Sequence, residues 1–263
     1  MDRINPDAAW FAGITLGDGS LSGRMVRVWN KEDYIVDKWI GILNEQFDIG
    51  NDKIKIRKLG RERSGFRRSE ETNEATVNSV EFNRKIRRLC HTALSSKDFN
   101  VIKSVMRGIF DAEGSICGRC EIVLWQRKND QGTEIANFVR SKLAELGIEF
   151  LEDSDDRFYI IRVLGGVKNK DNIKKFSKLI GFSHPEKRKW LELDLEILTL
   201  NKTVGEREII NFLKERNYVT IKEMVLHFKV IETRIRRCLR KLEERTVIRK
   251  IYTWPRTFSI ACA

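Results

Sequence analysis

One short pattern occurs twice in the chain. Residues Phe11–Gly19 read FAGITLGDG, and residues Met106–Gly114 read MRGIFDAEG. Each copy is an apolar stretch that ends in one carboxylate followed by glycine, Asp18 in the first copy and Glu113 in the second. The two acids lie 95 residues apart (113 minus 18), so the pattern predicts two structural repeats of about that length.

Small residues recur in both copies at a spacing of four, which places them on one face of a helix. They are Gly13 and Gly17 in the first copy and Gly108 and Ala112 in the second. We expect the two helices to pack with their backbones unusually close, which would bring the two carboxylates together at one end. Such a pair is repulsive unless a hard divalent cation such as Mg²⁺ lies between the acids. The arrangement is typical of a phosphodiesterase.

The alternative is that the two acids are merely polar helix ends. The helix macrodipole disfavours a carboxylate near a helix C-terminus. Two carboxylates at equivalent points of two repeats therefore favour a compensating cation.

The two segments resemble the paired motifs of LAGLIDADG homing endonucleases, in the form that carries both halves on one chain. The stretches after the two motifs are also alike, with Val26–Lys31 (VRVWNK) in the first half and Ile122–Arg127 (IVLWQR) in the second. The resemblance covers about the first 200 residues. It implies an α+β fold of two pseudo-symmetric αββαββα repeats packed through the motif helices. One departure is Leu16, where the first motif often has an acid that Asp111 keeps in the second.

The resemblance implies metal-dependent hydrolysis of both strands of duplex DNA by a monomer, with Mg²⁺ as the cofactor and one carboxylate serving each strand. The implied catalytic residues are Asp18, Glu113, Asn30, Gln126, Lys31 and Arg127, with backbone carbonyls of Gly17 and Ala112 completing the metal shell beside the two acids. The amides stand at equivalent strand ends, and the cations beside them would neutralise the scissile phosphate. An ordinary helix-capping role for Asn30 stays open, because Asp33 follows three residues later.

Composition independently favours a nucleic-acid partner. The chain has 263 residues, 50 Lys and Arg against 38 Asp and Glu, and a net charge of +12, which suits a polyanion. No apolar run is long enough to cross a bilayer and the N-terminus lacks a secretory pattern, so we expect an intracellular protein, cytoplasmic or organellar. Five cysteines are an odd count that suggests reduced thiols. Cys117 and Cys120 form a C-x-x-C, for which a tight turn is favoured over a zinc or redox site, since no second Cys pair lies at the expected distance.

Periodicity divides the chain into a first repeat (1–96), a second repeat (97–200) and a tail (203–263). In the first repeat we expect helices over 6–18, 31–47 and 80–93, strands over 21–29, and an Arg-rich hairpin tip over 60–74. Lys53, Lys55 and Arg57 alternate with Ile54 and Ile56, which predicts a half-buried strand. In the second repeat we expect Ser96 as the N-cap of the motif helix, helices over 132–146, 169–180 and 185–200, and strands over 116–125 and 157–164.

The tail holds 14 basic and seven acidic residues, a net of +7 in less than a quarter of the chain. Helices are expected over 205–216, from the capping box Thr220–Glu223 to Phe228, and over 232–244, followed by strands at 248–252 and 257–260. Three helices and a basic hairpin resemble a winged helix-turn-helix domain, with the third helix in a major groove. A protein-docking module is the alternative.

The predicted DNA contacts lie on outward strand positions, the Arg-rich tip and the tail. They are Arg24, Arg27, Lys53, Lys55, Arg57, Arg61, Arg67, Arg119, Glu121, Arg162, Arg234, Arg237, Lys241 and Arg256. Two other functions stay open. One is a non-cleaving DNA-binding regulator, against which the presence of both acids argues, and the other is an RNA-splicing maturase, for which the basic surface is equally suitable.

Overall fold

The computed structural model describes residues 4–59, 71–117, 120–216, 218–251 and 257–260. The chain divides into two compact units. The first comprises Met1–Ser115, Val123–Arg162 and Lys175–Arg188, and the second comprises Ile116–Ile122, Val163–Lys174 and Lys189–Ala263. Within the described ranges, no helix is both long enough and apolar enough to span a bilayer.

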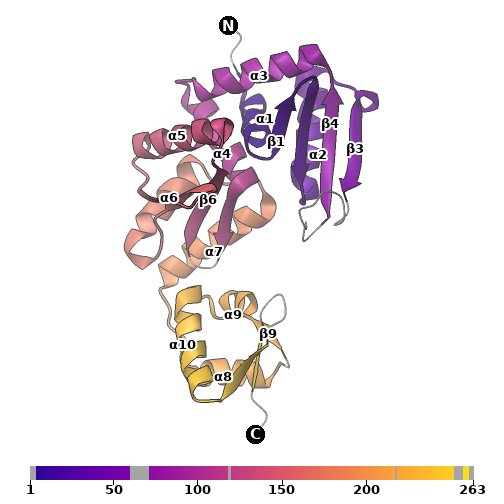
Figure 1. Ribbon diagram of the computed structural model, residues 1–263. Helices are drawn as coiled ribbons and strands as arrows, with labels where there is room; N and C mark the ends of the chain where they lie inside the picture. The colour runs from indigo at the N-terminus through magenta and orange to yellow at the C-terminus, as the bar shows by residue number, and fades with distance from the viewer. Residues whose placement is uncertain (1–3, 60–70, 118–119, 217, 252–256, 261–263) are drawn as a thin grey trace. The chain divides into compact units, whose positions relative to one another are not determined.

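The predicted αββαββα order occurs twice (Figure 1). The first repeat consists of α1 (Pro6–Gly17), β1 (Gly19–Ser22), β2 (Met25–Asn30), α2 (Asp33–Phe47), β3 (Ile54–Leu59), β4 (Thr72–Asn78) and α3 (Val80–Leu94). The second consists of α4 (Phe99–Glu113), β5 (Gly114–Cys117), β6 (Glu121–Arg127), α5 (Asp130–Glu145), β7 (Phe150–Ser154), β8 (Phe158–Val163) and α6 (Lys170–Leu179). Helix α7 (Pro185–Leu200) follows.

Local side-chain chemistry fixes several helix starts. Asn5 caps α1 by accepting a hydrogen bond from the Ala8 N–H, and Ser79 caps α3 by accepting one from the Phe82 N–H, as capping residues do. The expected cap Ser96 is wrong for α4. Asp98 is the N-cap and accepts from the Asn100 N–H, while the Ser96 hydroxyl accepts from the Asp98 N–H one turn earlier.

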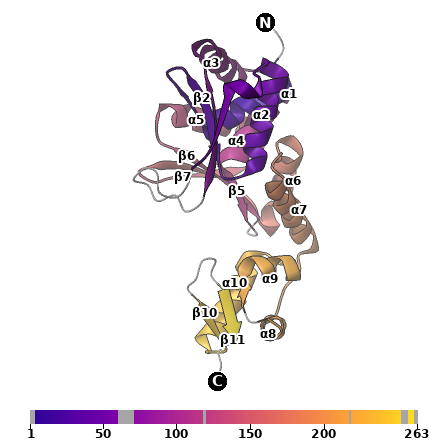
Figure 2. The ribbon, with the colours of Figure 1, turned by 90° about the vertical axis from the view of Figure 1, so that its right-hand side faces the viewer.

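The two motif helices, α1 and α4, lie side by side (Figures 1 and 2). A Cβ added to Gly13 would lie 2.3 Å from the Val105 carbonyl oxygen, and one added to Gly108 would lie 2.4 Å from the Trp10 carbonyl oxygen. Cβ atoms do not approach backbone oxygens so closely, so both positions require glycine. The expected close approach of the two backbones is confirmed.

The first sheet has strand order β1-β2-β4-β3, with antiparallel neighbours. One face carries Val26, Val28, Ala75 and Val77, all buried, and α1, α2 and α3 pack against this sheet. Residues 72–74, expected in the hairpin tip, belong to β4. The rest of the tip, 60–70, lies outside the described residues.

The predicted half-buried strand over 53–57 is correct only at its start. Ile54 is buried, but Ile56 is 61% exposed, although it pairs with Ala75 on the buried face. Strand β3 is at the edge of the sheet, so its later residues extend past the helices that cover Ile54. Alternation along a strand cannot show where this cover ends.

The second sheet has the matching order β5-β6-β8-β7. In the first unit, an aromatic cluster packs behind the second motif helix, with the Phe110 ring 4.9 Å from that of Phe176 and 6.5 Å from that of Phe182 between centroids. These rings are buried together with Ile109 and Met106 of the same helix. The cluster joins α4 to the end of α6 and to the segment before α7.

The tail forms three helices, α8 (Glu206–Lys214), α9 (Ile221–Phe228) and α10 (Glu232–Glu244), with β9 (Val219–Thr220), β10 (Ile248–Ile251) and β11 (Thr257–Ile260). The Thr220–Glu223 capping box is present at α9. Ile235, Leu239 and Leu242 of α10 are buried as expected. The unpredicted strand β9 completes a three-stranded sheet of order β10-β11-β9. Residues 252–256 of the hairpin lie outside the described residues.

Candidate active site

The two acids of the repeated motif come together where α1 and α4 end. Asp18 is the C-cap of α1, and Glu113 is the last residue of α4. A Cβ on Gly17 would lie 2.6 Å from the Cβ of Ala112 and 3.2 Å from the Cγ of Glu113, so the absence of a side chain at Gly17 leaves room for the acids. Both carboxylates are half-buried.

The first acid has an amide partner in its own repeat. The Asn30 side-chain N–H donates to Oδ2 of Asp18 at 2.6 Å, and the Trp29 backbone N–H donates to the Asp18 carbonyl oxygen at 3.0 Å. The other atom of the amide, Oδ1 of Asn30, accepts from the Glu32 N–H at 2.8 Å. Asn30 therefore orients the acid and also orders the chain before α2.

The second acid differs. Gln126, the expected counterpart of Asn30, is buried, and among the described residues its Oε1 has no hydrogen-bond partner. Lys31 and Arg127, which flank the two amides, are both exposed beside the strand ends. The structure thus brings Asn30 to Asp18 but shows no equivalent amide bond for Glu113.

A lysine that sequence reasoning missed lies beside both acids. The ammonium of Lys187, in the first turn of α7, donates to the carbonyl oxygens of Phe110 at 3.2 Å and Ala112 at 3.5 Å, and also to that of Asp111. These carbonyls end α4, where a cation is favoured by the macrodipole. The sequence did contain a signal for Lys187. The macrodipole disfavours a lysine in the first turn of its own helix, so its presence there indicates a partner elsewhere.

Asp111 explains how Lys187 reaches this place. Its buried carboxylate accepts from the Trp10 indole N–H at 2.8 Å, and from the backbone N–H groups of Ser183 and His184. It thereby ties α1 and α4 to the turn that leads into α7. The second motif has Asp111 where the first has Leu16, and this acid has a positioning role.

At the matching position of the first motif, Leu16 takes part through its backbone. Its carbonyl oxygen accepts from the Gln131 side chain of α5 at 2.7 Å. Each motif helix therefore has its last turn capped by a polar side chain from the second repeat or from α7, and neither residue was predicted.

The surroundings of Asp18 and Glu113 disfavour two negative charges. Burial raises the pKa of Asp18 to about 6, against partial opposition from the Asn30 hydrogen bond and the Lys187 charge. Burial and then the charge of Asp18 raise the pKa of Glu113 to about 8, with Lys187 opposing. Burial lowers the pKa of Lys187, while the charges of Asp111, Asp18 and Glu113 oppose the shift. A divalent cation would relieve the repulsion.

The donor set fits a hard cation that keeps part of its water shell. The described residues contain no group of three or more His, Cys, Asp or Glu side chains that could hold a metal. Mg²⁺ in phosphoryl-transfer sites is bound by one or two carboxylates, with water and substrate phosphate completing the shell. Asp18, Glu113 and neighbouring backbone carbonyls supply this kind of oxygen set.

The predicted DNA-contacting residues are partly placed. In the first sheet, the register puts Arg27 and Lys55 opposite Thr76, and Arg57 opposite Glu74, so all three cations lie on the face away from the buried valines. Arg27 is less free than expected, with Nη1 3.8 Å from Glu74. Arg24 and Lys53 are exposed, and Glu121 and Arg162 are half-exposed. Arg61, Arg67, Arg119 and Arg256 lie outside the described residues.

In the tail, one of the four predicted contacts is hydrogen-bonded within the protein. Arg234 is half-buried and donates to the carbonyl oxygen of Asn201 at 3.3 Å, to its side-chain oxygen at 2.9 Å and to the Lys202 carbonyl oxygen. Arg234 is therefore less free for DNA than expected, although these hydrogen bonds lie at the surface. Arg237 and Lys241 are exposed on α10, as expected.

The C-x-x-C segment leads to a buried carboxyl that was not predicted. The Cys120 thiol is buried and donates to the Asp194 backbone carbonyl oxygen at 3.8 Å. Asp194 in α7 is fully buried. Burial raises the pKa of Asp194 to about 7, against opposition from hydrogen bonding by Cys120, so this carboxyl is largely neutral in mildly acidic solution.

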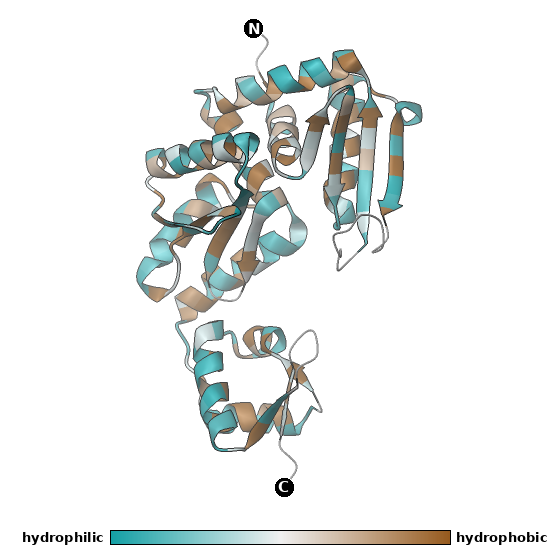
Figure 3. Cartoon of the chain, in the orientation of Figure 1, coloured by the Kyte–Doolittle hydropathy of each residue, from teal (hydrophilic) through white to brown (hydrophobic). Residues whose placement is uncertain are grey.

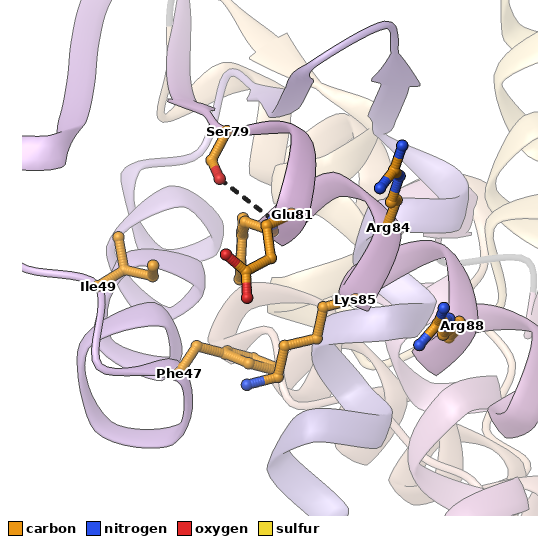
Figure 4. Close-up of a pocket in the computed structure, with 8 residues that line it drawn as sticks. Phe47, Ile49, Ser79, Glu81, Arg84, Lys85 and Arg88 are labelled. Carbon is orange, nitrogen blue, oxygen red and sulfur yellow. Dashed lines mark hydrogen bonds between the residues drawn. The ribbon is translucent and has the colours of Figure 1, made fainter.

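A pocket of about 560 Å³ lies between the end of α2 and the start of α3. Figure 4 shows its lining, and the Ser79 cap of α3 lies at its rim. The lining residues are Phe47, Ile49, Ser79, Glu81, Phe82, Arg84, Lys85 and Arg88. None of the predicted catalytic residues is among them, so the acid pair belongs to a different part of the surface.

Comparison with known proteins supports both parts of this description. A DeoR-like helix-turn-helix domain matches residues 206–253. A search of curated proteins gave no match. Among solved structures, "The crystal structure of I-DmoI in complex with DNA and Ca" aligns with a TM-score of 0.52 and 16% identity, covering 71% of this chain and 97% of that one.

A second solved structure aligns over the tail as well. "Crystal structure of full-length DUF199/WhiA from Thermatoga maritima" has a TM-score of 0.52 and 12% identity, and covers 93% of both chains. Identities this low establish the fold alone. The chain therefore has the LAGLIDADG fold, with two αββαββα repeats joined through their motif helices, followed by a helix-turn-helix region.

Proposed function

We propose that this protein is a DNA endonuclease of the homing type, which hydrolyses both strands of a long duplex site with the help of divalent metal ions. The observation that carries the proposal is the pair of half-buried carboxylates, Asp18 and Glu113, at the matching ends of two helices whose backbones touch. The similarity of the fold to I-DmoI, whose structure was determined with DNA and Ca, supports it.

Bound Mg²⁺ would supply the charge that activates water and stabilises the leaving 3′ oxygen. Asp18 and Glu113 would hold it, together with the carbonyls of Gly17 and Ala112, and each carboxylate would serve one strand. Asn30 fixes the orientation of the Asp18 side chain through Oδ2. Lys187 keeps a positive charge beside both acids. Lys31 and Arg127, which are exposed next to the strand ends, would attract the scissile phosphates.

In this proposal, the open face of the first sheet, with Arg27, Lys55 and Arg57, contacts the major groove, and the tail adds phosphate contacts through Arg237 and Lys241 of α10. Affinity should then fall steeply with salt, because each phosphate contact releases counterions.

The test is cleavage of a randomised duplex library with Mg²⁺, by the wild type and by Asp18→Asn and Glu113→Gln. Selective cutting by the wild type that is lost in both variants, with duplex binding retained, would support the proposal and identify the target. Binding without cutting by all three proteins would refute it.

The second candidate is a DNA-binding protein that does not cut. The observation that favours it is Lys187, whose ammonium already contacts the Ala112 carbonyl that a metal would use. The charge of Lys187 opposes the repulsion between the two acids without any metal. Calorimetric titration separates the candidates, because Mg²⁺ binding that is abolished by Glu113→Gln is expected only of the endonuclease.

A further inference from the structure

The edge strands of the two sheets carry opposite charge. Strands β3 and β7 hold the same place in sheets of matching order, β1-β2-β4-β3 and β5-β6-β8-β7. Residues 53–59 contain four cations and no acid, whereas residues 149–156 contain five acids and no cation. Figure 3 shows hydrophilic bands along β3 at the sheet edge. The charged residues are Lys53, Lys55, Arg57 and Lys58 in the first group, and Glu149, Glu152, Asp153, Asp155 and Asp156 in the second.

The basic edge is available to a polyanion. All four of its cations are exposed. Within the described residues, none of them forms an ion pair. Lys55 and Arg57 lie on the same face as Arg27, the face away from the helices. Among the described residues, this edge therefore presents a line of positive charge without ion-pair partners.

The acidic edge is only partly compensated. Arg140 pairs with Glu152, and Arg162 lies 3.9 Å from Asp153. Asp155 accepts from the backbone N–H groups of Arg157 and Phe158, and these bonds lower its pKa, so its charge is maintained. The side chain of Asp153 is still 64% exposed, and Asp156 is exposed beside it. A phosphate backbone within a Debye length of this edge, about 8 Å at physiological salt, would be repelled.

We propose that the protein holds duplex DNA asymmetrically, with the basic β3 edge on the phosphate backbone and the acidic β7 edge held away from it. The first repeat then supplies most of the salt-dependent affinity of the core. The tail, with its net charge of +7, adds further backbone contacts. This inference rests on the proposed DNA-binding function and adds that the two sheet edges contribute unequally to binding.

The experiment measures binding of a fluorescent 40-base-pair duplex of random sequence by anisotropy, over a series of salt concentrations. One variant of the full chain carries Lys53→Gln, Lys55→Gln and Lys58→Gln. The matched variant carries Glu149→Gln, Asp153→Asn and Asp156→Asn. All six positions are exposed, and circular dichroism melting checks that both variants fold.

We expect the basic-edge variant to lose at least tenfold in affinity at about 0.1 M salt and to lower the slope of log K against log salt by about 2 to 3, near 0.9 per lost contact. The acidic-edge variant should keep the wild-type slope and change affinity less than about threefold. A wild-type slope in the basic-edge variant would overturn the inference. So would a large loss of affinity in the acidic-edge variant, because its acids would then contact the bases. A wild type that binds no duplex would refute the proposed function as well.

Discussion

The two motif ends match in sequence and differ in how their acids are supported. Asp18 receives a hydrogen bond from Asn30, twelve residues later in the same repeat. The charge of Lys187, 74 residues after Glu113 in α7 (187 minus 113), acts on both acids. Burial raises the pKa of Asp18 to about 6, and burial together with the charge of Asp18 raises that of Glu113 to about 8. The first end therefore has a local hydrogen bond in addition to the distant lysine.

The two motif ends stay together only while α1 and α4 are in contact, so the largest effect is expected from a substitution that forces these helices apart. Gly108→Ala would place a methyl group 2.4 Å from the Trp10 carbonyl oxygen, and should lower the free energy of unfolding by about 3 kcal/mol. Urea denaturation measures this. The matched control is Gly41→Ala in α2, where a Cβ meets nothing within 4 Å, and which should stabilise by about 0.5 to 1 kcal/mol. Equal effects of the two substitutions would contradict the close helix contact.

The pH dependence of stability sharpens the difference between the acids. Both pKa values are raised by folding, so the stabilisation is fully present below about pH 4 and is lost as pH rises through about 6 and about 8. In EDTA, the free energy of unfolding of the wild type should fall by about 1 to 3 kcal/mol between pH 5 and pH 9. Glu113→Gln should flatten this profile more than Asp18→Asn does. A stronger flattening by Asp18→Asn than by Glu113→Gln would contradict the higher pKa of Glu113.

Replacing Lys187 tests the support of the second end. Lys187→Met removes the positive charge that lowers the pKa of Glu113. It also removes the donor that caps the α4 carbonyls. We expect a loss of about 1 to 2 kcal/mol at pH 9 and less at pH 5, where Glu113 is protonated. Lys189→Met, at an exposed position in the same helix, is the control and should change little. A loss independent of pH would show that Lys187 acts only as a cap.

The smallest effect is expected at the first end. Asn30→Ala removes the donor to Asp18 and should cost about 0.5 to 1.5 kcal/mol at pH 8. A double-mutant cycle with Asp18→Asn isolates the coupling of the pair. Additive effects would mean that the hydrogen bond contributes nothing and that Asn30 acts only through the Glu32 N–H.

Much of this architecture is determined by local sequence. Helix starts are set by side chains within a few residues, as at Asn5 and Thr220, and α7 and α10 have the predicted bounds. The paired small residues predicted the helix contact because only their size matters there. Ser96 and Asp98 are both good caps two residues apart, and the sequence alone could not choose between them.

The parts that could not be predicted depend on distant contacts. The place of Lys187 in the first turn of its own helix indicates that it needs a partner, but only the bonds of Asp111 to residues 183 and 184 show that the partner is the end of α4. Arg234 looks free until the chain near Asn201 reaches it. Exposure of Ile56 depends on how far the covering helices extend along the sheet.

The contact at Gly13 and Gly108 also bears on how such repeats can be exchanged between proteins. The two helices meet there backbone to backbone, without interlocking side chains that would have to match in shape. A foreign second repeat could therefore pair with this first one if it offers glycine at the same register and an acceptor for the Trp10 indole N–H, as Asp111 does here. Recombination between related genes, or the construction of chimeras with new target sites, then depends at this joint on a single small residue from each parent.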